Sequence, residues 1–71
     1  MATLEEARAA KRKAARRLAR VTQVNGIGVV RAGTGYGLKV NLAEPVAAGV
    51  IPEAVDGVPL RAFVVGRLRR R

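Results

Sequence analysis

The chain of 71 residues contains no cysteine, histidine, tryptophan or serine, and it has only one tyrosine and one phenylalanine. Without cysteine it cannot form a disulfide or a thiolate metal site, and without histidine it also lacks the imidazole ligand. A Ser-His-Asp or Cys-His catalytic set cannot be built from these residues. The few acidic residues are scattered, with no pair spaced for general acid–base catalysis. We therefore expect no enzyme activity, no cofactor, no metal and no small-molecule substrate.

Long apolar runs are also missing. The apolar stretch 46–52 is far shorter than the roughly 20 residues that span a bilayer. The basic N-terminus has no apolar segment behind it, as a secretory signal would, and Glu5, Glu6 and the lack of serine argue against a transit peptide. We expect a soluble, cytoplasmic protein without membrane contact.

Positive charge is what the chain has in abundance, and it lies at the two ends. Fourteen basic residues outnumber five acidic ones, for a net charge of +9. Residues 1–24 and 67–71 hold this excess, while 25–66 are balanced. The pattern predicts a basic amphipathic helix over 1–22, a small β-β-α-β body over 23–68 and a basic tail over 69–71.

The N-terminal part is expected to be helical from residue 3 to about 21. Thr3 and Glu6 have the spacing of a capping box, in which each side chain bonds the other residue's backbone N–H. Alanine, arginine and lysine are strong helix formers, and Asn25-Gly26 is a stop signal. The apolar stripe of this helix is shallow because it is mostly alanine: Leu4, Ala7, Ala14, Leu18 and Val21.

Another side of the same helix carries arginines at every fourth position. Two interpretations stay open: a solvated face, or a contact for an anionic surface such as nucleic acid. Two aromatic residues are few for gripping single strands by stacking, so sequence-independent phosphate contact is the form we expect. The candidate nucleic-acid-binding residues are Arg8, Arg12, Arg16 and Arg20, with Arg69, Arg70 and Arg71 of the tail.

The body begins with a predicted β-hairpin. Residues 26–31 and 36–42 form its strands around a loop at 32–35, and apolar side chains alternate from Tyr36 to Leu42. The glycine-rich segment 33–37 could form an anion-binding nest, but it contains no nucleotide-binding fingerprint. A flexible hairpin turn is the favoured interpretation.

A short helix and a third strand are expected to follow. Pro52 suits the first turn of a helix ending near Val55, and residues 58–68 alternate as a strand that starts or lies at an edge because of Pro59. The predicted fold is α+β in the order α-β-β-α-β. Its three-stranded sheet is mostly antiparallel, with the third strand beside the first.

Three segments resemble a known unit: 26–29 (GIGV), 37–42 (GLKVNL) and 51–66, which contains IPE, VDGVPL and VVG. Together they are similar to the short β-β-α-β leader unit that precedes the catalytic domain of some bacterial trypsin-like serine peptidases. The resemblance covers about residues 24–68. It implies this fold order and an accessory module, and it carries over no catalytic residue and no ligand.

Two functions follow as hypotheses. The first is a non-catalytic interaction or regulatory module that binds a protein partner or self-associates, because the thin core leaves apolar residues of the third strand for an interface. The expected interface residues are Leu60, Phe63 and Val65. The alternative is a sequence-independent nucleic-acid-binding protein that uses the arginines named above.

Overall fold

The computed structural model describes residues 2–66, and its first element is helix α1, Leu4–Arg17. The Thr3 hydroxyl accepts a 3.1 Å hydrogen bond from the Glu6 N–H, and the Thr3 N–H donates a 2.8 Å bond to Glu6 Oε1. The predicted capping box is therefore confirmed. The helix ends earlier than expected, with Leu18 as its C-cap, and Asn25-Gly26 lies in the following strand rather than acting as the stop.

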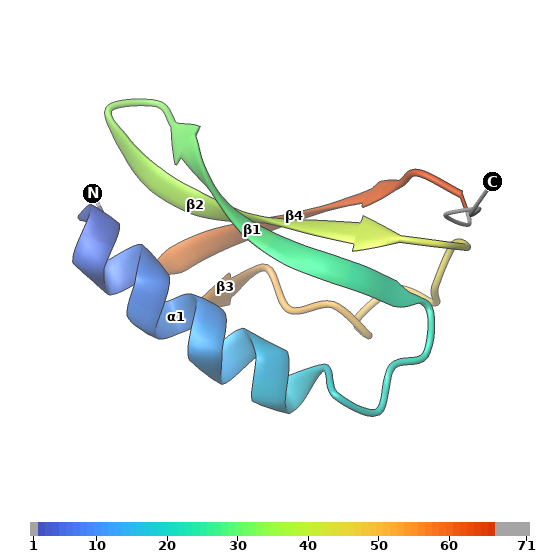
Figure 1. The fold of residues 1–71 in the computed structure, drawn as a ribbon. Coiled ribbons are helices and arrows are strands. Elements are labelled where there is room, and N and C mark those ends of the chain that lie inside the picture. Colours follow the sequence, from blue (N-terminus) through green and yellow to red (C-terminus); the bar gives the residue numbers. More distant parts are fainter. Residues whose placement is uncertain (1, 67–71) are drawn as a thin grey trace, which may run out of the picture.

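Four strands form one mixed sheet in the order β1-β2-β4-β3: β1 (Val24–Ala32), β2 (Gly35–Leu42), β3 (Ala54–Val55) and β4 (Val58–Val64). The predicted α+β class is confirmed, but the predicted three-stranded arrangement is not. β1 and β2 form the expected antiparallel hairpin, whereas β4 pairs with β2 in parallel and not with β1. The parallel pairing is possible because residues 43–57 are long enough to return the chain to the same end of the sheet (Figure 1).

The short helix predicted over Pro52–Val55 is not present. Ala54 and Val55 instead form β3, which pairs antiparallel with the start of β4. Asp56 and Gly57 have φ values of 50° and 79°, the two positive values that a type I′ hairpin turn requires. Asp-Gly therefore closes a hairpin, and not a helix.

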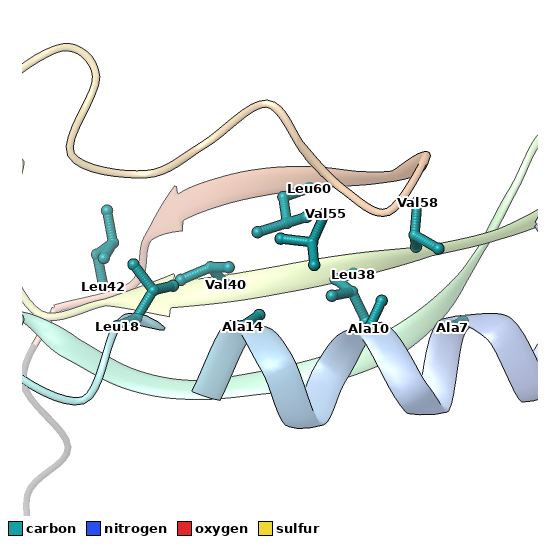
Figure 2. Packing of buried hydrophobic residues seen from close by; sticks show 10 residues of the cluster. All are labelled: Ala7, Ala10, Ala14, Leu18, Leu38, Val40, Leu42, Val55, Val58 and Leu60. Carbon is teal, nitrogen blue, oxygen red and sulfur yellow. The ribbon is translucent and has the colours of Figure 1, made fainter. Parts of the chain in front are cut away.

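The core lies between one face of the sheet and α1, which docks on that face and does not project. The connection 43–53 between β2 and β3 covers the same face beside the helix, so Val46 and Ile51 also pack against the core (Figure 1). Ala7, Ala10 and Ala14 let the helix backbone approach the strands closely. Figure 2 shows the ten buried hydrophobic residues of the core: Ala7, Ala10, Ala14, Leu18, Leu38, Val40, Leu42, Val55, Val58 and Leu60.

The β1–β2 loop and the segments before α1 and after β4 lie at the ends of the sheet. The β1–β2 loop has two residues, Gly33 and Thr34, rather than the four expected. The Tyr36 N–H donates a 3.0 Å bond to the Ala2 carbonyl, which ties the start of the chain to β2. A bulge interrupts the β1–β2 register at Asn25, whose side-chain amide donates a 3.0 Å bond to the Gly66 carbonyl.

Candidate functional site

The face of the sheet opposite α1 is open. Side chains alternate along strands, so residues between Leu38, Val40 and Leu42 point away from the helix. The β2 register sets Lys39 between Gly28 of β1 and Arg61 of β4, and sets Asn41 beside Phe63. Among residues 2–66, no helix or strand covers this face (Figure 1).

A groove of about 500 Å³ lies on the open face. It is lined by Val30, Arg31, Ala32, Gly33, Gly37, Leu38, Lys39, Pro59, Arg61 and Phe63. Three of these ten residues are cationic and none is acidic. The Lys39 ammonium lies 5.3 Å from the centroid of the Phe63 ring, and this ring is 45% exposed. The groove therefore presents positive charge next to one accessible aromatic surface.

Gly37 lines this groove at a point where the chain around Pro59 and Ala32 approaches β2 closely. A Cβ at this position would lie 3.1 Å from the Pro59 carbonyl oxygen and 3.2 Å from Ala32 Cβ. A Cβ at Gly28, in contrast, would meet nothing within 4 Å. Close packing therefore requires glycine at position 37, while the open space above Gly28 leaves the surface beside Lys39 accessible.

The second candidate surface is the edge of β4. The Leu60 N–H donates to the Glu53 carbonyl on the β3 side, and the Val65 N–H donates to the Leu42 carbonyl on the β2 side. Because successive residues point to opposite edges, Ala62 and Val64 direct their N–H and C=O groups toward the edge beyond the end of β3. Within the described chain, no strand pairs with this part of β4.

The expected interface residues of β4 do not all lie at the surface. Phe63 and Val65 are 45% and 49% exposed, and Val64 between them is 54% exposed. Leu60 is only 8% exposed and belongs to the core, so its expected place in an interface is corrected. The alternation that places Leu60 opposite Leu38 turns its side chain toward α1.

The third surface is the outer side of α1. Arg8, Arg12 and Arg16 are exposed and lie at helical i, i+4 spacing. Arg20 is also exposed, but it lies in the turn after the helix, so it does not continue the ladder in helical geometry as expected. Residues 69–71 lie outside the described residues.

The glycine-rich segment contains the tight turn of the β1–β2 hairpin. Gly33 has φ 61°, and it is the first of the two loop residues, where a type II′ turn takes glycine. Gly35 and Gly37 are strand residues of β2. Over the described range there is no group of three or more acidic, histidine or cysteine residues that could hold a metal ion. The one helix in this range is too short and too polar to cross a membrane.

Sequence reasoning missed the groove. The sequence shows that Lys39 and Arg61 each alternate with apolar residues in their own strands. It does not show that the two residues lie close together, because this depends on the parallel β2–β4 register. Only the pairing Lys39↔Arg61 brings the two cations and Phe63 together.

No protein-family model, curated protein or solved structure matched the chain. The resemblance to the leader unit of trypsin-like peptidases therefore stays a prediction. Its β-β-α-β order differs from the structure at the third element, where β3 stands in place of a helix.

Proposed function

We propose that this chain is a non-catalytic interaction module that binds the strand of another protein molecule at the free edge of β4. The observation that carries the proposal is that the backbone N–H and C=O groups of Ala62 and Val64 face the free edge of β4. The exposed side chain of Val65 lies next to them. An unpaired, apolar edge of this kind is a template for an additional strand. The edge is short and β4 has no proline after Pro59, so each N–H group of β4 that faces the free edge can donate a hydrogen bond.

A second copy of the chain is the partner that this edge fits. In an antiparallel pair centred on Phe63, each Ala62 lies opposite the second copy's Val64, and the two copies exchange about four backbone hydrogen bonds. The two Phe63 rings then form a cross-strand aromatic pair, and Arg61 lies opposite Val65 rather than opposite another cation. The edge is thus self-complementary in its backbone hydrogen-bonding register and brings no two like charges directly opposite each other.

Magnitudes indicate a weak association. A backbone hydrogen bond contributes a net of about 0.5–1.5 kcal/mol, and an aromatic pair adds about 0.5–1.5 kcal/mol. Association itself costs about 4–15 kcal/mol. The most favourable ends of these ranges leave a net of about 3.5 kcal/mol, which corresponds to a Kd of a few millimolar. We therefore expect monomers at micromolar concentration and a growing share of dimers only as the concentration approaches the millimolar range.

Light scattering over a concentration series tests this proposal. The unmodified chain should rise from monomer toward dimer as its concentration approaches about 1 mM. Val64→Lys places a charge on the edge and should keep the chain monomeric. Val50→Lys is the matched control, since Val50 is 38% exposed but lies in the connection, and this variant should still dimerise. A strict monomer throughout, or equal behaviour of both variants, would rule out the second copy as partner.

A second candidate function is sequence-independent nucleic-acid binding through α1. It is favoured by one specific observation: the arginines at positions 8, 12 and 16 are exposed on a helix that docks through its alanines. This leaves the basic side free to lie along a phosphate backbone. Three contacts predict a log–log salt slope of about −3 on duplex DNA.

The two functions separate by substitution. Replacing Arg12 and Arg16 by glutamine should weaken duplex binding and make its slope shallower by about 2, without changing dimerisation. Leu18→Asp should disturb the docking of α1 on the sheet, because Leu18 is 4% exposed. If the arginine substitutions change neither the affinity for duplex DNA nor its log–log salt slope, the helix is excluded as the contact.

A further inference from the structure

The groove on the open sheet face combines two cations with an aromatic ring, and of these three only the Phe63 ring also contributes a contact to the strand pairing proposed above. Lys39 and Arg61 are direct neighbours across the β2–β4 pair, and the exposed Phe63 ring lies beside them. None of the ten lining residues carries negative charge. The volume of about 500 Å³ is within the range of roughly 300–1,000 Å³ that is common for ligand sites.

The groove is also accessible to a flat group. The open space above Gly28 lies across β2 from Arg61, with Lys39 between them. The ammonium over the Phe63 ring is an exposed cation–π pair, which is a weak interaction. A ligand with an aromatic ring and an anionic group can therefore replace it by stacking on Phe63 and bonding to Lys39.

We propose that the groove binds single-stranded nucleic acid, with a base stacked on Phe63 and the adjoining phosphates held by Lys39 and Arg61. Single strands are bound by positively charged grooves in which bases stack on aromatic side chains, and an open sheet face is one established platform for this. A duplex does not fit this site because its bases are already stacked on each other. An acidic peptide would satisfy the cations but would make no use of the Phe63 ring.

One ring and two principal cations predict weak binding without sequence preference. With about two to three phosphates neutralised, the log–log salt slope on a single strand should be close to −2. The site goes beyond the proposed strand pairing, because a strand added at the β4 edge lies on the side of β4 away from β2. It is also separate from the arginines of α1, because α1 lies on the opposite face of the sheet (Figure 1).

The experiment is fluorescence anisotropy with a labelled, short, mixed-sequence single strand and the corresponding duplex. Phe63→Leu keeps an apolar side chain but removes the ring, and should weaken single-strand binding about fivefold or more. Phe63→Tyr keeps the ring and should bind as the unmodified chain does. The double variant Lys39→Gln with Arg61→Gln should bind more weakly, with a slope shallower by about 1.4.

The matched control removes the same charge elsewhere. The double variant Arg12→Gln with Arg16→Gln should leave the log–log salt slope of single-strand binding unchanged. It should also leave the weakening caused by Phe63→Leu unchanged, even if duplex binding is lost. The proposal is overturned if Phe63→Leu binds single strands as the unmodified chain does, or if only the helix double variant loses them. A glutamate-rich peptide supplies the second contradicting result. The proposal is overturned if this peptide binds the unmodified chain more tightly than the single strand does and is weakened by the same groove substitutions. Self-association is measured without nucleic acid, so failure of one proposal does not imply failure of the other.

Discussion

Lys13 Nζ lies 2.7 Å from Asp56 Oδ2, and this ion pair joins the middle of α1 to the turn between β3 and β4. The two side chains are 54% and 58% exposed, so water and salt screen their attraction. The pair orients the helix over the sheet, but burial of the helix alanines holds it there. Loss of the ion pair should therefore cost much less stability than disruption of the alanine packing.

Replacing Lys13 by glutamine should lower the free energy of unfolding by less than about 1 kcal/mol, and the difference should vanish at high salt. Urea denaturation at low and high ionic strength measures it. Lys11→Gln is the control, because Lys11 is an exposed lysine of the same helix. A loss above about 2 kcal/mol would mean that the ion pair, and not the alanine packing, docks the helix.

Enlarging a buried alanine of α1 should be far more costly than losing the ion pair. Ala14 is fully buried against the sheet, so Ala14→Leu should destabilise the fold by about 1–3 kcal/mol through overpacking. Ala15→Leu makes the same change at the next, exposed position and should stay within about 0.5 kcal/mol. Equal unfolding midpoints in urea for the two variants would show that α1 does not dock through this face.

The turn after β3 gives a prediction at the level of the backbone. Gly57 has φ 79°, so Gly57→Ala should cost about 1–2 kcal/mol because a side chain disfavours this conformation. Gly28→Ala is the contrast, since a Cβ there meets nothing within 4 Å, and it should be neutral or stabilise by up to about 1 kcal/mol. Thermal unfolding of both variants measures the difference. Reversal of this order would contradict the hairpin assigned to Asp56-Gly57.

The helix N-terminus should make stability depend on pH. The hydrogen bond from the Thr3 backbone N–H, aided by the Thr3 side chain, holds the pKa of the Glu6 carboxyl below its ordinary value. A carboxyl group whose pKa is lower in the folded state stabilises the fold above its unfolded pKa, and this contribution is lost as pH falls through the folded pKa. We expect part of the loss of stability below about pH 4.5 to come from Glu6.

Urea titrations at neutral pH and near pH 3 check this point. Glu6→Gln should reduce the difference between the two pH values, whereas Glu5→Gln, the neighbouring control, should reduce it less. Thr3→Ala should cost about 0.5–2 kcal/mol at neutral pH, and Thr3→Ser should retain most of the cap. An unchanged pH difference in Glu6→Gln would exclude the capping box as its source.

The elements that sequence reasoning predicted correctly are those determined by neighbouring residues. Thr3 and Glu6 define the start of α1 within one turn, and the alternation from Tyr36 to Leu42 defines β2 and its buried face. The end of α1 was placed too late because residues 18–21 continue the apolar spacing. At Leu18 the chain nevertheless leaves the helix to reach the sheet.

The elements that were missed depend on contacts distant in sequence. Asp56-Gly57 is a strong hairpin signal, but β3 has two residues, and a run this short shows no alternation that would separate it from a helix end. The choice of β2 as partner for β4 is determined by the path of residues 43–57. The groove was missed for the same reason, because Lys39 and Arg61 meet only through that pairing.

Amide hydrogen exchange followed by NMR at low and high protein concentration tests the central claim most directly. If the edge of β4 pairs with a second copy, the N–H groups of Ala62 and Val64 should become protected as concentration rises, while that of Gly49 in the connection should not change. Exchange at Ala62 and Val64 that stays fast and independent of concentration would contradict strand pairing at this edge.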